Sequence, residues 1–235
     1  MTILRTLMVF ILMAVPFRAY AVTDAAIIDG FNKTVFDSEY AGFTLGRSYV
    51  RKFTGTVRIY VRSTVGVAKQ AQVQRFARSL NGLIRGLRVR IVTNEKRANF
   101  VVHLVRRREY ADTVRYRVFK RRGVPVRGLC MVRSNFTRDG ITRSDAVIVG
   151  DEGQKLFKRC MTEEILQGLG PLNDDKSLTQ SMFNDRTRFT TFRRFDRLIL
   201  NMLYDRRIKP GMSRREANVL LPSVLRRVRR RLARR

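Results

Sequence analysis

The segment Phe100–Val105 (FVVHLV) constrains the fold of this chain more than any other. It is an apolar run interrupted only by His103, without the polar alternation of a half-buried strand. A continuous run of this kind is typical of a strand that is buried on both faces. We therefore predict a covered strand here and interpret the rest of the chain around it.

The residues before this strand predict its neighbours. Residues 57–61 alternate apolar and polar side chains at the period of a half-buried strand. Between residues 67 and 87, apolar side chains recur near one face of a helix. Residues 89–92 form a second short strand pattern. The expected order is therefore strand, helix, strand, strand.

The sequence after residue 105 predicts two more strands and three helices. Residues 106–127 are crowded with arginine and interrupted by Gly123 and Pro125, so we expect a loop or an edge hairpin. The apolar patterns place strands at 129–132 and 146–149, and helices at 154–169, at 192–204 and after Ser213.

The N-terminus has the features of a secretory signal peptide over residues 1–21. Arg5 precedes the apolar run 7–15, and Ala19-Tyr20-Ala21 fits the small-x-small rule for cleavage. The run is shorter than the roughly 20 residues of a membrane-spanning helix, and we expect no transmembrane segment in the mature chain. We therefore predict a periplasmic or secreted protein that begins near Val22.

The formal charge of +30, carried mostly by arginine, limits the kinds of partner that the protein is expected to bind. Planar guanidinium groups suit phosphate, and outside the cytoplasm the abundant polyanions are lipid headgroups and acidic envelope polymers. We therefore expect an anionic membrane surface, an envelope polymer or a protein partner rather than nucleic acid. The alternative is that the arginines only form a solvated surface.

Cys130 and Cys160 are the two cysteines of the chain. In an oxidising compartment they predict one disulfide that closes a loop of about 30 residues. Two buried free thiols are the alternative. Since His103 is the one histidine, no Cys/His zinc site can be assembled.

The helix expected at 154–169 carries an unusual carboxylate. Its apolar side chains form one stripe at about 100 degrees per residue, and Glu164 falls in the middle of that stripe. Glu163 and Gln167 lie together beside it, and Gly170 ends the helix. A core-facing carboxylate is costly unless it is paired or protonated, so Glu164 needs an explanation.

The segment from Glu163 to Asp174 resembles the active-site helix and turn of metzincin peptidases. That family carries H-E-x-x-H-x-x-G-x-x-H or D, which supplies two imidazoles, a glutamate base, a glycine turn and a third ligand. The resemblance places the base at Glu164 and the turn at Gly170. It places the three ligand positions at Glu163, Gln167 and Asn173.

A closer resemblance is to a bacterial exported family, the domain of unknown function 2927. It rests on segments at 50–53, 98–102, 160–167, 173–174, 181–185, 203–205 and 210–212. The two resemblances imply an α+β fold, with a metzincin-like mixed sheet, a long backing helix, a peptidase-like helix and C-terminal helices. They imply one zincin-like domain over residues 22–222, without an established activity.

The ligand positions disfavour a working zinc peptidase. Zinc hydrolases need three good donors, and the amide oxygens of Gln167 and Asn173 are much weaker donors than imidazole. His103 is expected to be a core or edge-strand residue rather than a relocated ligand. We expect neither a zinc ion nor another cofactor. A calcium site is an alternative, using oxygen atoms of Glu163, Gln167, Asn173, Asp174 and Asp175.

The favoured interpretation of Glu164 is structural. It is then a buried group that is hydrogen-bonded or paired with an arginine, and the cleft either binds a peptide without cutting it or is filled in.

Residues 223–235 form an arginine-rich tail. A capping box of Ser213 and Glu216 starts the last helix, and Pro222 is expected to break or kink it. Beyond it, apolar residues spaced three to four apart predict a helix that lies on an anionic membrane surface. The residues expected to contact that surface are Arg226, Arg227, Arg229, Arg230, Arg231, Arg234 and Arg235. A solvated charge run is the alternative.

The leading prediction is an exported, non-catalytic cell-envelope protein on a zincin-like scaffold that lacks the zinc ligands. It would bind an anionic envelope component or a protein partner. The alternative is an atypical metallohydrolase or peptidase with Glu164 as general base. A nucleic-acid binder is a third hypothesis, suggested by charge alone and lacking aromatic stacking platforms.

Overall fold

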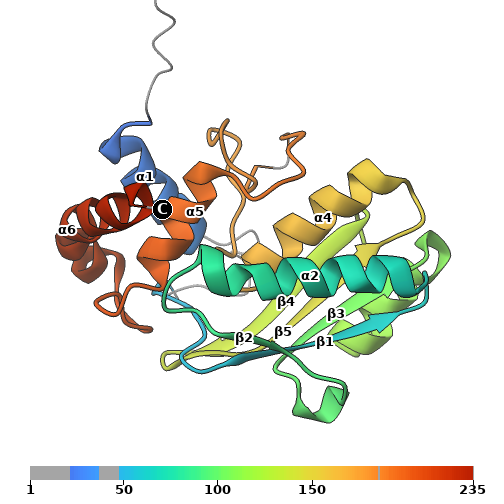
Figure 1. The fold of residues 1–235 in the computed structure, drawn as a ribbon. Coiled ribbons are helices and arrows are strands. Elements are labelled where there is room, and N and C mark those ends of the chain that lie inside the picture. The colour runs from blue at the N-terminus through green and yellow to red at the C-terminus, as the bar shows by residue number, and fades with distance from the viewer. Residues whose placement is uncertain (1–21, 37–47, 185, 235) are drawn as a thin grey trace, which may run out of the picture.

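A five-stranded mixed sheet forms the centre of the structure, a computed structural model that describes residues 22–36, 48–184 and 186–234 (Figure 1). The strand order is β2-β1-β3-β5-β4. The strands are β1 (Val57–Ser63), β2 (Val89–Ile91), β3 (Phe100–Val105), β4 (Cys130–Thr137) and β5 (Gly140–Val149). The first four in this order are parallel, and β4 runs antiparallel to β5 at one edge. All six residues of the central β3 are buried, which confirms the prediction from its apolar run.

The β4–β5 hairpin is longer than the apolar patterns predicted. The far ends of the two strands are mostly polar, and they continue the ladder by pairing with each other as far as Thr137 and Gly140. Gly140 has φ 131°, and a Cβ there would lie 2.5 Å from the carbonyl oxygen of Lys52. The close approach of these two backbones therefore requires a glycine at the turn.

Two helices cover one face of the sheet, α2 (Val67–Leu83) and α4 (Gln154–Gln167) (Figure 1). Val73, Ala77 and Leu80 of α2 are fully buried in the main hydrophobic core. Phe157 and Ile165 of α4 join the same core. The predicted α+β class and the long backing helix are confirmed.

The segment after β3 covers the other face and differs from the prediction. It forms three consecutive short helical turns, η3 (Arg107–Glu109), α3 (Tyr110–Asp112) and the π-helix η4 (Thr113–Phe119). The predicted loop or edge hairpin is therefore wrong over these residues. Tyr110, Val114 and Val118 recur every four residues and pack against the far face of β3 and β5. Burial of this stripe favours the helical conformation.

The remaining helices, α1 (Asp24–Val35), α5 (Arg194–Leu203) and α6 (Arg214–Ala233), pack together beside the sheet (Figure 1). Helix α6 runs through Pro222, so of the predicted break or kink the break is wrong. Leu221 and Val224 are fully buried on either side of the proline. Their packing offsets the hydrogen bond that proline cannot donate.

The predicted signal peptide, residues 1–21, lies outside the described residues. In the part of the chain that the structure describes, no helix has the length and the apolar character needed to cross a membrane.

Candidate functional site

A cleft of about 690 Å³ lies between β4 and α4. One wall is formed by every residue from Arg127 to Ser134, and the other by residues of α4 from Leu156 to Gln167. Leu172 and Asp174, which follow α4, also line it. Because consecutive residues of β4 border the cleft, it follows the edge of the strand and not only one of its faces.

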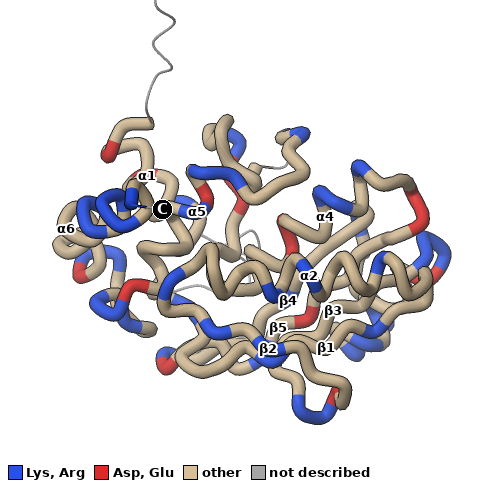
Figure 2. The backbone as a smooth tube through the Cα atoms, viewed as in Figure 1, with Lys and Arg blue, Asp and Glu red and all other residues tan. Residues whose placement is uncertain are grey.

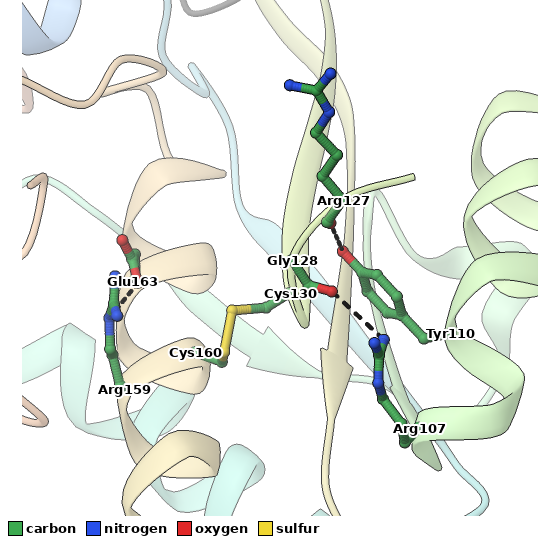
Figure 3. Close-up of a disulfide and its surroundings, with 8 residues drawn as sticks. All are labelled: Arg107, Tyr110, Arg127, Gly128, Cys130, Arg159, Cys160 and Glu163. Carbon is green, nitrogen blue, oxygen red and sulfur yellow. Dashed lines mark hydrogen bonds and ion pairs between the residues drawn. A yellow bond between two sulfur atoms is a disulfide. The ribbon is translucent and has the colours of Figure 1, made fainter. Parts of the chain in front are cut away.

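A disulfide between Cys130 and Cys160 crosses from β4 to α4 at this cleft (Figure 3). The two Cα atoms are 5.8 Å apart, within the usual range for such a bridge. The predicted disulfide is confirmed, and the alternative of two free thiols is wrong. Its presence is consistent with an oxidising compartment.

The helical turns after β3 hold the residues that lead into β4. The Tyr110 hydroxyl donates a hydrogen bond to the carbonyl oxygen of Arg127 (3.2 Å), and Arg107 donates to that of Gly128 (3.5 Å) (Figure 3). These contacts fix the backbone just before Cys130. The segment predicted as a loop therefore positions one end of the disulfide.

Helix α4 brings two buried carboxylates to the cleft. Glu163 is 4% exposed and Glu164 is 5% exposed, and both line the cleft. Arg159, one turn earlier on α4, pairs with Glu163 at 3.2 Å (Figure 3). This pair has the i, i+4 spacing and could have been found in the sequence. It neutralises one of the two acidic groups.

The cysteine sulfur lies close to these carboxylates. Ligand atoms of Cys130, Glu163 and Glu164 all lie within 4.8 Å of one another. Within the described ranges, this is the one group of three or more His, Cys, Asp or Glu side chains at metal-binding separations. Because Cys130 is disulfide-bonded, its sulfur is not a thiolate ligand in this state.

The other predicted ligand positions take different partners. The Gln167 amide lines the cleft and donates a hydrogen bond to Asp174 Oδ1 (2.8 Å). The Asn173 amide instead donates to the carbonyl oxygen of Lys33 on α1 (2.9 Å). Asp174, and not Asn173, therefore lies beside Gln167. The sequence did not reveal this, because side-chain direction after a helix end depends on the local backbone.

The structure does not bring together the ligands of the alternative calcium site. Neither Asn173 nor Asp175 lines the cleft. The Asp175 carboxylate accepts hydrogen bonds from the backbone N–H (2.8 Å) and the hydroxyl (2.5 Å) of Ser177. These bonds hold the pKa of Asp175 below its usual range. Asn173 therefore connects the loop after α4 to α1, and Asp175 stabilises a turn within that loop.

Gly170 makes the turn after α4 possible. Its φ is 142°, and a Cβ at this position would lie 2.4 Å from the carbonyl oxygen of Arg51. Both the backbone conformation and the space exclude a larger residue. The turn directs the chain back along the cleft toward Asp174.

A polar network that the sequence did not indicate holds the loop between α4 and α5. Asp196 is fully buried and accepts hydrogen bonds from the Ser181 hydroxyl (2.6 Å) and from the Met182 backbone N–H (3.1 Å). Burial raises the pKa of Asp196 to about 6, although these hydrogen bonds act in the opposite direction. The loop is thereby tied to the first turn of α5.

His103 is a core residue, as predicted. It is 2% exposed and contacts Asp145, with 3.3 Å between Nε2 and Oδ1. On β3 it shares a face with Val105, which packs against the helical turns and not against α4. The sheet therefore separates His103 from Glu163 and Glu164.

The apolar stripe of the C-terminal tail lies inside the protein. Val224, Leu225 and Val228 are fully buried in the main core, so their prediction as a membrane-contacting face is wrong. A stripe of this spacing packs equally well against lipid or against other helices, and here α6 packs on α1 and α5.

Some arginines of α6 contact other parts of the protein, and others are exposed to solvent. Arg227 pairs with the buried Asp205, Arg229 pairs with Asp24 (2.7 Å), and Arg231 donates to Asn201 (3.3 Å). Burial alone would raise the pKa of Asp205, but hydrogen bonds from Arg227 and the Arg207 backbone hold it below its usual range. The exposed positions are Arg226, Arg230 and Arg234. Arg235 lies outside the described residues.

The basic end of α6 also forms a hollow. A depression of about 410 Å³ is lined by Arg227, Arg230, Arg231 and Arg234. Figure 2 shows basic residues along this helix and dispersed over the remaining elements. The hollow is thus a local cluster of arginines in a chain whose basic residues are otherwise dispersed.

The fold and the cleft define a disulfide-bonded α+β domain in which an edge strand faces a helix that carries two buried carboxylates. The chain matches the family described as "Protein of unknown function (DUF2927)" over residues 24–223. It therefore belongs to that family, which confirms the resemblance seen in its sequence segments. None of the curated proteins matches this chain.

Proposed function

We propose that this protein is exported and binds an extended segment of a partner protein in the cleft between β4 and α4, without cleaving it. The observation that carries this proposal is the position of β4. It pairs with β5 on one side, and no other strand among the described residues pairs with its outer edge. An edge strand beside a cleft can accept an added strand through main-chain hydrogen bonds.

The side chains of the cleft support binding without cleavage. Glu163 is paired with Arg159, Gln167 with Asp174, and the sulfur atoms with each other. The resemblance of residues 163–174 to a metzincin active site supports a peptide-binding origin of the cleft, on a scaffold that has lost its imidazole ligands. Hydrolysis with Glu164 as general base is the competing hypothesis.

Two observations support export to the periplasm or the exterior. The chain begins with the pattern of a cleaved signal peptide. Its two cysteines form a disulfide, as expected where thiols are not kept reduced.

Selection of a random peptide library on the oxidised protein tests the proposal. The affinity of a selected peptide should fall by about tenfold or more in Leu156→Arg, which places a bulky cation in the cleft. Val219→Arg is the matched control, because this side chain is 78% exposed on α6. Binding should also slow amide hydrogen exchange in β4.

Equal affinity for both variants, or exchange in β4 that does not change, would refute strand addition. Mass spectrometry of the incubated peptide tests cleavage. Fragments that form with the wild type and not with Glu164→Gln would establish the competing hydrolase.

A second function, binding of an anionic envelope component, is favoured by the hollow at the end of α6. Four guanidinium groups around one depression suit phosphate-bearing headgroups. Binding to vesicles should rise with anionic lipid and weaken with salt. Replacing Arg230 and Arg234 with serine should reduce it more than the same change at Arg75 and Arg78 on α2. Equal losses of vesicle binding from both pairs of substitutions would show that binding depends on the overall charge and not on the hollow.

A further inference from the structure

We infer that reduction of the Cys130–Cys160 disulfide converts the end of the cleft into a zinc site, with Cys130, Cys160, Glu163 and Glu164 as ligands. Three of these residues lie on α4 at positions i, i+3 and i+4, which share one helical face. The fourth, Cys130, comes from β4 opposite this face. The site is thus built across two elements that the disulfide holds together.

The distances suit zinc. Ligand atoms of Cys130, Glu163 and Glu164 already lie within 4.8 Å of one another, and Cys160 is joined to Cys130 by the disulfide. Zinc holds thiolate sulfur at about 2.3 Å and carboxylate oxygen at about 2.0–2.2 Å, in a tetrahedral arrangement. After reduction, we expect the four donors to reach that arrangement by rotation of their side chains, with α4 and β4 left in place.

The redox step is balanced by a dithiol reductant. Two electrons and two protons pass from the dithiol to the protein disulfide, so that the dithiol becomes a disulfide and the protein gains two thiols. Zinc binding then releases the two thiol protons, because the thiolate is the metal ligand. The oxidised protein therefore lacks both sulfur ligands, and reduction supplies them together.

The surroundings fit a zinc ion with anionic ligands. Glu163 and Glu164 are almost completely buried, so few water molecules compete for them. Four anionic ligands leave a net negative charge around Zn²⁺, and Arg127 and Arg159 line the same cleft. Arg159 already pairs with Glu163 and can stay as its hydrogen-bond partner outside the metal. Two thiolates also favour zinc over calcium or magnesium.

This inference is independent of peptide binding, which concerns the oxidised cleft. The test uses the full chain, reduced with a dithiol under anaerobic conditions and separated from the reductant. Equilibrium dialysis against zinc chloride with elemental analysis should give one zinc per reduced chain and none per oxidised chain. Cobalt(II) should give thiolate-to-metal charge-transfer absorption in the reduced protein alone.

Variants separate a four-ligand site from binding by two thiols. Glu163→Gln and Glu164→Gln should each weaken zinc binding by about tenfold or more. Glu152→Gln is the matched control, since this exposed acid precedes α4, and should bind as the wild type does. Equal affinity of all three variants would overturn the assignment of the carboxylates.

Stoichiometric zinc in the oxidised protein, or none in the reduced protein, would overturn the site itself. Circular dichroism follows the fold throughout. A reduced chain that is unfolded both with and without zinc would also refute the inference, because the site requires α4 to face β4.

Discussion

Removal of the disulfide should destabilise the fold by a predictable amount. The bridge joins residues 30 apart in the sequence, and the chain-entropy relation for a loop of that length gives about 3.6 kcal/mol at 25 °C. The double variant Cys130→Ala with Cys160→Ala should lose this contribution. For a chain of this size, the loss corresponds to a fall in Tm of about 7–14 °C.

Urea denaturation of the oxidised wild type and the double variant measures this difference. The m value should rise in the variant, because its unfolded chain is less compact. Reductant should lower the stability of the wild type toward that of the variant, and should not affect the variant itself. A difference below about 1 kcal/mol would refute the reasoning and indicate that the β4–β5 hairpin already restrains this loop when the chain unfolds.

Three further predictions concern a glycine turn and two buried carboxylates. Gly170→Ala should cost about 2 kcal/mol or more in urea denaturation, because its Cβ would meet a carbonyl oxygen at 2.4 Å and its φ is 142°. Since burial raises the pKa of Asp196 from 3.8 to about 6, the folded state keeps a proton that the unfolded state releases. Its contribution to stability should fall by roughly 3 kcal/mol as the pH rises from about 4 to 6, and Asp196→Asn should remove this slope. Arg227→Met should cost about 2 kcal/mol, because it removes one of two arginines from a carboxylate whose side chain is 1% exposed. A double-mutant cycle with Asp205→Asn would show no coupling if this pair were only a surface contact.

The sequence predicted elements whose patterns are local. The apolar run of β3 and the amphipathic α4 each carry enough information within a few turns or residues to indicate their conformation. The disulfide was predictable because the chain has two cysteines. Nothing local, however, indicated that the bridge would lie beside Glu163 and Glu164, since that depends on how β4 packs against α4.

The failures have a common physical cause. Tyr110, Val114 and Val118 form a clear stripe, but the arginines between them suggested a solvated loop. The stripe of α6 was recognised, yet its pattern does not distinguish a lipid surface from a protein core, because both are apolar. In each case the sequence shows an amphipathic face, and only the tertiary structure shows what covers it.

The proposed zinc site makes a further prediction, because metal and disulfide would restrain the same two elements. Reduction removes a cross-link worth about 3.6 kcal/mol between β4 and α4. Zinc bound only to the folded state stabilises it by about 4 kcal/mol when its free concentration is 1,000 times Kd. We therefore expect the Tm of the reduced protein to rise with zinc and to approach that of the oxidised protein. The same titration of the reduced Glu163→Gln, Glu164→Gln double variant should give a much smaller rise. A reduced wild type whose Tm is insensitive to zinc would show that α4 and β4 no longer hold the four ligands together.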